Sequence, residues 1–358
     1  MKTVIVTAVG SFSAPAVIRE LKETGFRVVG TDINPKELIA MSAEADVFVN
    51  LPRCDAGQRY VDAMAELILR EKADAVLPLT DAELDVLNEV RDQLKPAVLW
   101  ASPAEAVRVS RDKVKSRAAA ERAGAKVIPT ELLADAFSGE GALPRKEALP
   151  GEEALSGKEA LLKSPGLPLI LKPRDGRSSQ GLYRVRTEAE LAGALKEIRR
   201  TGREKDYLVQ PLIEGRIVTV DVVRFPDGTC TAAPREEYVR TWNGAGLSVH
   251  VFRDRTLEET CSAVAEELGI LGCVNFEFIH AEDGSYYFME CNPRFSGGTG
   301  FSIAAGDHVV RKHLAAFGAV PEEDPEKVPE EDPETEAQYG GASECWIARK
   351  YVEVITES

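Results

Sequence analysis

Apolar and polar positions alternate along the first hundred residues in a way that predicts helices and strands in turn. Apolar residues recur at helical spacing in three segments, Pro15–Thr24, Gly57–Glu71 and Ala82–Leu94. Short apolar runs around them predict strands at Thr3–Val9, Arg27–Asp32, Asp46–Leu51, Ala75–Leu79 and Ala97–Trp100. Because such alternation is typical of a parallel sheet with helices on both faces, residues 1–103 are expected to form a small Rossmann-like domain.

The pattern changes after this domain. A basic helical stretch, Pro103–Gly124, precedes a predicted strand at Lys126–Thr130. Helices are predicted at Thr187–Arg199 and Leu257–Leu268. The other apolar runs are joined by turns and predict strands at Pro168–Lys172, Leu182–Arg186, Tyr207–Leu212, Ile217–Arg224, Thr229–Arg240 and Glu344–Val354. Runs of strands with few helices indicate antiparallel sheets, so the whole chain is expected to be mixed α/β and α+β.

One stretch of this second region, Cys273–Ser296, carries the clearest chemistry. Two apolar runs flank Asp283-Gly284, which predicts a hairpin with a two-residue turn and positive φ at both turn residues. In that register Glu277 faces Glu290 and Asn275 faces Asn292, and all four side chains lie on one face. Opposed carboxylates repel each other, so a compensating cation is expected. Carboxylate and amide oxygens suit Mg²⁺, or Mn²⁺, on Glu277, Glu290 and Asn292.

Three further segments are candidates for ligand binding. Lys172 ends a strand and precedes a Gly- and Ser-rich loop whose backbone N–H groups suit phosphate: Gly176, Ser178, Ser179, Gln180 and Gly181. Pro211 interrupts a strand, which predicts an edge or crossing segment with free backbone groups of the kind that adenine recognition needs. Thr80, Asp81 and Glu83 follow a strand of the parallel sheet, at the edge where such sheets bind ligands; a helix N-cap explains them as well. Arg235 and Arg240 are candidates for contacts with a triphosphate, although a solvated strand face also explains either one.

The amino-acid composition excludes several functional classes for this protein. The 358 residues carry a net charge of −15 with a pI near 5.0, so no basic footprint for nucleic acid exists. Pro321–Glu336 alone has nine acidic residues and one lysine and is expected to be a solvated connection, as is the low-complexity stretch 136–165. Six scattered cysteines suggest reduced thiols in a cytoplasmic protein, and no apolar run is long enough for a membrane helix. Asp32 is placed as a ribose-binding acid would be, but Gly10-Ser11-Phe12 lacks the glycine spacing of a dinucleotide site.

Taken in order, the lysine before a Gly/Ser loop, the proline-containing strand before Glu-Gly, and the acidic hairpin ending Glu-x-Asn-Pro-Arg resemble the ATP-grasp superfamily. More narrowly, the chain is similar to the short carbamoyl-phosphate-synthase-like carboxylate–amine ligases over nearly its whole length. The resemblance implies three parts. They are a pre-ATP-grasp domain at 1–103, linker helices and a small lobe at 104–212, and a large lobe with the metal-binding hairpin at 213–358.

The resemblance also implies roles for individual residues. Lys113 and Lys172 match the two phosphate-binding bases of the family, and the loop from Gly176 to Gly181 would close over the γ-phosphate. Arg294 matches a contact to phosphate or acylphosphate, beside a substrate pocket that includes Ser296 and Gly297. The acid that the family uses for ribose is replaced here by Ile217. The adenine hinge of the family corresponds to four consecutive residues, Gln210, Pro211, Leu212 and Ile213.

The activity implied is ATP-dependent ligation of a carboxylate to an amine through an acylphosphate, with release of ADP and phosphate. The substrates are expected to be small molecules such as amino acids, with ATP and Mg²⁺ as cofactors, and a homodimer is common in the family. Two alternatives stay open at this point. One is carbamoyl-phosphate-type phosphorylation of bicarbonate or carbamate, and the other is a non-catalytic, ATP-binding regulatory module.

Overall fold

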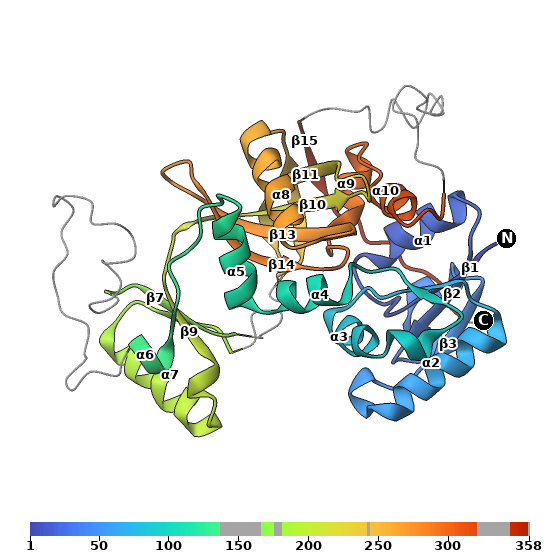
Figure 1. Cartoon of the computed structure of the whole chain (residues 1–358), viewed down its shortest axis with the longest axis horizontal. Helices are drawn as coiled ribbons and strands as arrows, with labels where there is room; N and C mark the ends of the chain where they lie inside the picture. The colour runs from blue at the N-terminus through green and yellow to red at the C-terminus, as the bar shows by residue number, and fades with distance from the viewer. Residues whose placement is uncertain (137–165, 175–180, 242–243, 321–343, 357–358) are drawn as a thin grey trace.

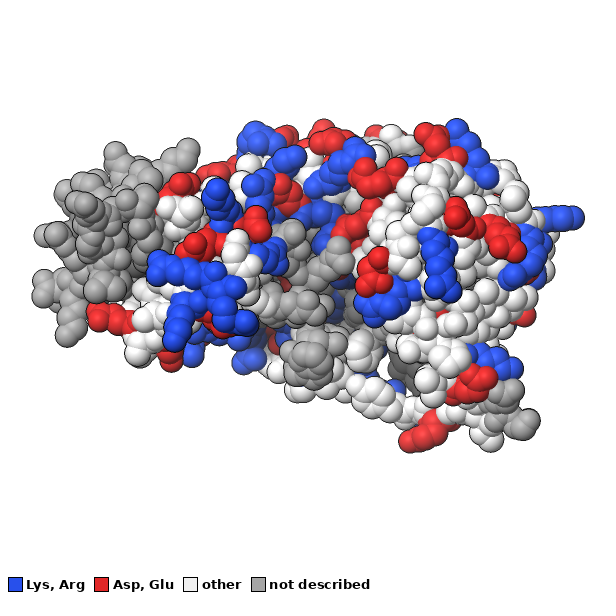
Figure 2. All heavy atoms as spheres, turned by 90° about the horizontal axis from the view of Figure 1, so that it is seen from below, with Lys and Arg blue, Asp and Glu red and all other residues white. Residues whose placement is uncertain are grey.

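The computed structural model describes residues 1–136, 166–174, 181–241, 244–320 and 344–356. These residues form three sheets, one parallel and two antiparallel, arranged along the long axis of the molecule (Figure 1). Charged side chains of both signs are interspersed over the face seen in Figure 2. None of the helices in these ranges is long and apolar enough to cross a membrane.

The N-terminal sheet is parallel, as predicted. Its strand order is β3-β2-β1-β4-β5, with bounds Thr3–Val6 for β1, Arg27–Asp32 for β2, Val47–Asn50 for β3, Ala75–Leu77 for β4 and Val98–Leu99 for β5. Three helices connect the strands: α1 (Ala14–Glu23), α2 (Gln58–Glu71) and α3 (Asp81–Glu89). The predicted third helix therefore ends five residues early, and a 3-10 turn at Arg91–Leu94 follows it. Both faces of the sheet are buried against helices, which explains the nearly continuous apolar runs of its strands.

The basic stretch forms two helices rather than one. Helix α4 (Ala104–Arg111) ends at Asp112, whose carboxylate caps α5 (Lys113–Arg122) by accepting from the N–H groups of Val114 and Lys115. The strand predicted at 126–130 is not formed. Val127 makes only an isolated bridge to Phe288, and the next strand, β6, spans Glu131–Leu132.

A four-stranded antiparallel sheet follows, in the order β6-β9-β7-β8. Its other strands are β7 (Leu169–Pro173), β8 (Tyr183–Val185) and β9 (Tyr207–Pro211), covered by α6 (Leu133–Ala136) and α7 (Glu188–Thr201). Pro211 predicted an edge or crossing segment, and β9 is not an edge strand. Strand β9 lies inside the sheet, but β6 pairs only with Leu208 and Val209, so the missing N–H of Pro211 disrupts no ladder on that side.

The largest sheet has six antiparallel strands in the order β14-β13-β10-β11-β12-β15. The bounds are β10 (Gly215–Arg224), β11 (Cys230–Arg240), β12 (Gly246–Val251), β13 (Gly272–Ala281), β14 (Tyr286–Asn292) and β15 (Cys345–Ala348). Helix α8 (Arg255–Glu267) packs on one face, while α9 (Thr299–Ala304) and α10 (Val309–Ala316) follow β14. The last strand is much shorter than the predicted 344–354, because residues after Ala348 leave the sheet.

The acidic hairpin β13–β14 has the expected pairing of acids but not the expected turn. Its loop has three residues, 282–284, of which only Gly284 has a positive φ, +76°. This is a type I turn followed by a left-handed glycine, and it shifts the register near the turn by one residue. A bulge at Met289 then restores the register, so that Glu277 faces Glu290 and Asn275 faces Asn292. Without the bulge, Glu290 would face Phe276, whose side chain belongs to the core beneath α8.

Several predictions fall outside the described residues. These are most of the low-complexity stretch 136–165, the acidic connection at 321–336, and Gly176, Ser178, Ser179 and Gln180 of the Gly/Ser loop.

Candidate functional site

The centre of the site is the pair Glu277 and Glu290, directly opposed on neighbouring strands. Burial, followed by the charge of Glu290, raises the pKa of Glu277 to about 7. Burial acts on Glu290 in the same direction, but Lys113 and Lys172 outweigh it and hold the pKa of Glu290 below its usual range. The pKa values of the two acids are therefore shifted in opposite directions although the side chains face each other, because the two lysines act mainly on Glu290.

Both lysines come from elements distant in sequence. Lys113, the first residue of α5, places its Nζ 3.4 Å from Oε2 of Glu290. Lys172, near the end of β7, is only 7% exposed. Burial lowers the pKa of Lys172 to about 8, and the nearby Glu290 partly offsets that effect. The structure thus brings together two bases and two acids from three parts of the chain.

The oxygen atoms around the pair suit a hard divalent cation. Asn292 donates from Nδ2 to Oδ1 of Asn275 at 3.2 Å and approaches Oε1 of Glu277 at 3.5 Å, so its amide lies beside both acids. The described residues contain no cluster of three or more His, Cys, Asp and Glu side chains suited to a metal. Two carboxylates and one amide nevertheless form a fitting set, since Mg²⁺ keeps waters and shares its shell with substrate phosphates. A cation there would also relieve the charge repulsion that raises the pKa of Glu277.

Arg294, two residues after β14, connects the end of this hairpin to the start of helix α3. Its Nη2 donates to Oδ2 of Asp81 at 2.8 Å, and Arg111 lies 3.5 Å from the other oxygen of the same carboxylate. Asp81 thus lies close to the site, but its carboxylate interacts with Arg294 and Arg111. Thr80 and Glu83 point elsewhere: Thr80 donates to Glu83 at 2.7 Å, and Glu83 also accepts from Thr7 and Tyr60 inside the N-terminal domain.

Strand β11 supplies one residue that sequence reasoning missed. Glu237 lies on the same face as the acid pair, accepts from Thr219 at 2.8 Å and forms an ion pair with Arg240 at 2.6 Å. Arg240 in turn lies 3.9 Å from Oε2 of Glu277. The alternation of β10 and β11 against β13 would have found Glu237, because register-matched residues of neighbouring strands share a face.

The four hinge candidates and Gly181 lie on the small sheet and its exit. Gln210 is 6% exposed and donates to Oγ1 of Thr130 at 2.7 Å, whereas Leu212 donates its N–H to Pro168. Gly181 has φ +72° beside the hydroxyl of Tyr207. Ile217 opposes Ile279 and Glu237 in the large sheet.

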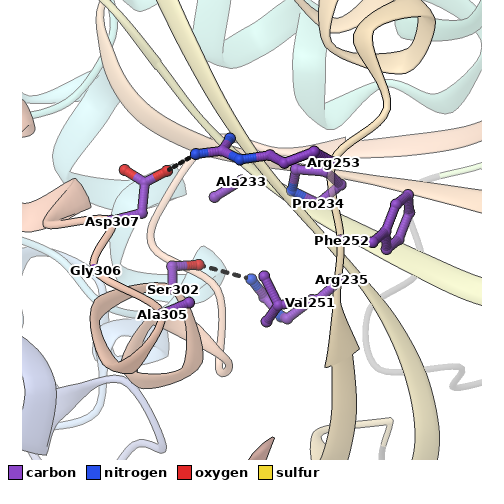
Figure 3. Close-up of a pocket in the computed structure, with 10 residues that line it drawn as sticks. All are labelled: Ala233, Pro234, Arg235, Val251, Phe252, Arg253, Ser302, Ala305, Gly306 and Asp307. Carbon is purple, nitrogen blue, oxygen red and sulfur yellow. Dashed lines mark hydrogen bonds and ion pairs between the residues drawn. The ribbon is translucent and has the colours of Figure 1, made fainter. Parts of the chain in front are cut away.

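Arg235 is buried, and its hydrogen bonds go to Asp221, Ser296 and Ser302 rather than to the acid pair. Arg235 also lines a pocket of about 230 Å³ (Figure 3). In the wall of the pocket, Nη2 of Arg253 lies 4.0 Å from Oδ2 of Asp307. The other lining residues come mainly from β11, the end of β12 and the end of α9. Gly297 accepts from Arg349 and lies next to Phe12 of the N-terminal domain.

Two family models match this chain. The model described as "PylC-like, N-terminal domain" matches residues 5–98, and "ATP-grasp in the biosynthetic pathway with Ter operon" matches residues 203–339. The chain therefore contains an ATP-grasp domain preceded by a PylC-like N-terminal domain. The acid pair, Asn292 and Arg294 all lie within the ATP-grasp match.

Known proteins agree with this assignment. The chain is 31% identical over 141 residues to the carbamoyl phosphate synthase large chain of Caldanaerobacter subterraneus subsp. tengcongensis, covering 37% of this chain and 13% of that protein. It is 27% identical over 295 residues to biotin carboxylase of Pseudomonas aeruginosa, covering 78% and 62% respectively. It is 30% identical over 144 residues to D-alanine–D-alanine ligase of Streptomyces griseus, covering 36% of each chain. The chain thus spans between 13% and 62% of the length of these relatives.

Solved structures show the same fold. Biotin carboxylase of Campylobacter jejuni, in complex with β,γ-ATP, matches with a TM-score of 0.68 at 20% identity and covers 89% of this chain and 72% of that one. N5-carboxyaminoimidazole synthetase of Staphylococcus aureus, in complex with ADP, gives 0.67 at 17% identity, with 90% and 80% covered.

Proposed function

We propose that this protein is an ATP-dependent carboxylate–amine ligase that uses Mg²⁺ and releases ADP and phosphate. The observation that carries the proposal is the opposed pair Glu277 and Glu290, flanked by Asn292 and approached by Lys113 and Lys172. Two half-buried acids facing two bases are costly unless a ligand with both a cation and phosphates completes them. Mg-ATP is such a ligand, and relatives solved with β,γ-ATP or ADP support that choice.

The reaction would proceed in two steps. A carboxylate oxygen attacks the γ-phosphorus of ATP, forming an acylphosphate while the bond to ADP breaks. An amine nitrogen then attacks the acyl carbon, the bond to phosphate breaks, and the nitrogen loses a proton. The substrate amine and carboxylate are proposed to belong to amino acids, which the match to a D-alanine–D-alanine ligase supports.

The residues of the chain would act mainly through charge. Lys113 and Lys172 would bind phosphate oxygens in place of Glu290, and one well-placed donor of this kind changes a rate by roughly 10²–10³. Arg294, held by Asp81, would bind the transferred phosphoryl group or the acylphosphate. Mg²⁺ on Glu277, Glu290 and Asn292 would neutralise the phosphates during transfer. The hinge Gln210–Ile213 would hold adenine, and the Gly/Ser loop is proposed to cover the phosphates.

The proposal is tested by measuring ADP and phosphate release from Mg-ATP with amino acids singly and in pairs. Release that requires both a carboxylate and an amine, and that is lost in Glu290→Gln, is the expected result. AMP and pyrophosphate as products would exclude an acylphosphate intermediate. Tight ATP binding without turnover across the panel would favour a regulatory module.

A second candidate keeps the site and changes the acid. Two biotin carboxylases align with the chain over 295 and 298 residues, and one similar structure contains MgADP and bicarbonate. Bicarbonate would then be the group that is phosphorylated. ADP release that depends on bicarbonate and needs no organic carboxylate would distinguish this reaction from the first.

A further inference from the structure

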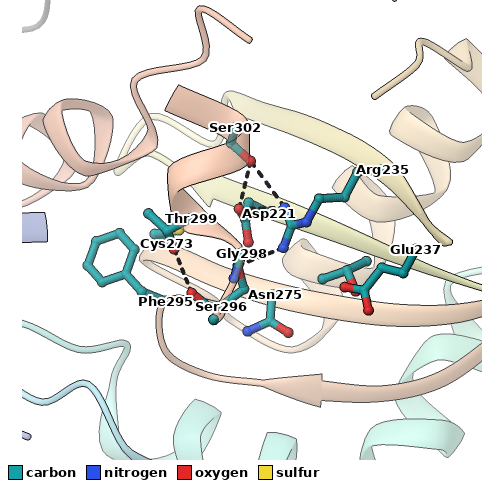
Figure 4. Close-up of polar contacts among 12 residues, drawn as sticks. Asp221, Arg235, Glu237, Cys273, Asn275, Phe295, Ser296, Gly298, Thr299 and Ser302 are labelled. Carbon is teal, nitrogen blue, oxygen red and sulfur yellow. Dashed lines mark hydrogen bonds and ion pairs between the residues drawn. The ribbon is translucent and has the colours of Figure 1, made fainter. Parts of the chain in front are cut away.

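A buried arginine lies on the same face of the large sheet as the acid pair, two strands away from Glu277. Arg235 on β11 is 1% exposed, and its Nη1 donates to Oδ2 of Asp221 at 2.8 Å and to Oγ of Ser302 at 3.1 Å (Figure 4). Its Nη2 donates to Oγ of Ser296 at 2.7 Å. One guanidinium therefore joins β10, helix α9 and the segment that follows β14.

That segment, Ser296–Gly298, is called the SGG segment below, and it is held from two directions. Oγ of Ser296 also accepts from the N–H of Gly298 at 3.1 Å, and a Cβ at position 298 would lie 2.6 Å from Nη2 of Arg235. Glycine at 298 thus allows the backbone to rest on the guanidinium. From the other direction Arg349 donates to the carbonyl of Gly297, with its guanidinium 5.0 Å from the ring of Phe12.

The position of this cluster along the sheet suggests its role. Strand β10 begins at Gly215, just after the hinge, and reaches Thr219 opposite Glu277 and then Asp221 opposite Asn275. Arg235 on β11 also faces Thr219, so its cluster lies beyond the hinge, level with Glu277 and Asn275 and across β10 from them on the same face. With adenine at the hinge and phosphates at the acid pair, the cluster lies beside the phosphates and away from the adenine, where the acyl group and its acceptor must meet.

A buried ion pair is a poor way to gain stability alone, because apolar residues of similar size often serve as well. A guanidinium offers something that they do not, namely a planar fork whose donors fix several acceptors in one geometry. Here the fork fixes Asp221 on the sheet and Ser296 on the SGG segment at the same time.

We propose that Arg235 is a positioning residue that fixes the SGG segment as a wall of the acceptor (amine) site. This inference rests on the proposed ligase function. It predicts that loosening the segment weakens use of the amine while ATP binding at the hinge and the acid pair stays intact.

The decisive variant is Ser296→Ala, which removes the link to the segment and leaves the Arg235–Asp221 ion pair in place. Arg235→Lys is the second variant, because a single ammonium cannot bond both sides. Val222→Ala is the matched control: it lies on β10, is buried on the opposite face, and should destabilise the sheet without touching the segment.

In steady-state kinetics Ser296→Ala and Arg235→Lys are expected to raise the KM for the amine roughly tenfold, the effect of losing one hydrogen bond to a charged group. The KM for ATP should change less than twofold, and Val222→Ala should change neither. An amine KM that is unchanged in Ser296→Ala, or an ATP KM that rises equally, would overturn the inference while leaving the ligase assignment intact.

Amide hydrogen exchange supplies a readout that does not need turnover. Peptides containing residues 296–300 should exchange faster in Ser296→Ala than in the wild type or in Val222→Ala. Equal exchange in all three proteins would overturn the anchoring role. Absence of any turnover by the wild type, with the exchange difference present, would instead count against the proposed function.

Discussion

The same isosteric change at the two opposed acids should have opposite effects on stability. The perturbations are Glu277→Gln and Glu290→Gln, each of which removes one charge and keeps the shape. The side chains are 19% and 27% exposed, so both are shielded enough for their charges to matter. Burial and Glu290 disfavour the charge on Glu277, whereas Lys113 and Lys172 favour the charge on Glu290.

The magnitude for Glu277 follows from linkage. Its pKa rises from 4.5 to about 7 on folding. Because the folded-state pKa is the higher one, the native state binds the proton more tightly, and stability falls as pH rises from about 4.5 to about 7. At roughly 1.4 kcal/mol per pKa unit, the ionised side chain costs about 3 kcal/mol at pH 7.5. Glu277→Gln should therefore stabilise the protein without metal by about that amount, and Glu290→Gln should destabilise it.

The assay is urea unfolding at pH 7.5 and at pH 5, with chelator and then with Mg²⁺. At pH 5 the advantage of Glu277→Gln should fall below about 1 kcal/mol, because Glu277 of the folded wild type is then protonated. Mg²⁺ should stabilise the wild type more than either variant, and both variants should lose turnover. If Glu277→Gln proves less stable than the wild type at pH 7.5 in chelator, or if both variants shift in the same direction, the electrostatic reasoning is wrong.

Three further outcomes are expected. Burial lowers the pKa of His313 to about 3, and its Nδ1 accepts from the N–H of Cys273 at 2.8 Å. The unfolded chain therefore takes up this proton first as pH falls below about 6.5, and linkage predicts a loss of about 2 kcal/mol by pH 5 that His313→Asn lacks in urea titrations. A parallel pH dependence in variant and wild type would refute this. Lys172→Met should lower turnover roughly 100-fold, since one phosphate donor is lost, and near-normal kinetics would place the lysine outside the reaction. Gly284→Ala, in open space at φ +76°, should cost about 1 kcal/mol through its backbone alone and leave turnover unchanged, which denaturation and ADP release can check together.

The hairpin shows how far local sequence determined the site. Alternation in β13 and β14 placed Glu277 and Glu290 opposite each other, and that pairing is present. The reasoning about the turn was nevertheless wrong: a three-residue loop shifts the register and the bulge at Met289 shifts it back. Bulges depend on contacts with neighbouring chain, here the N–H of Phe288 donating to Lys126, and those contacts leave no local mark in the sequence.

Elsewhere the sequence predicted which helices and strands exist better than it predicted where they end or which position they take in a sheet. The parallel sheet followed from the periodicity of residues 1–103, because both of its faces are buried and its strands read as apolar runs. Residues 126–130 and 349–354 read as strands as well, yet find no continuous partner, and a strand exists only through pairing. Pro211 suggested an edge or crossing segment, but β9 lies inside its sheet, where the missing N–H costs nothing because β6 stops short.

Both the sequence and the tertiary structure decided which residues make up the site. Residue type and spacing selected Glu277, Glu290, Asn292, Arg294 and Lys172, because charged and amide side chains at fixed offsets on a strand carry chemistry. Only tertiary structure brought Lys113 to Glu290 and Asp81 to Arg294 across 213 residues, and only tertiary structure buried Arg235 against Asp221 and Ser296. The sequence records which side chains can bind charge. Their protonation and partners depend on burial and on neighbours that distant segments supply.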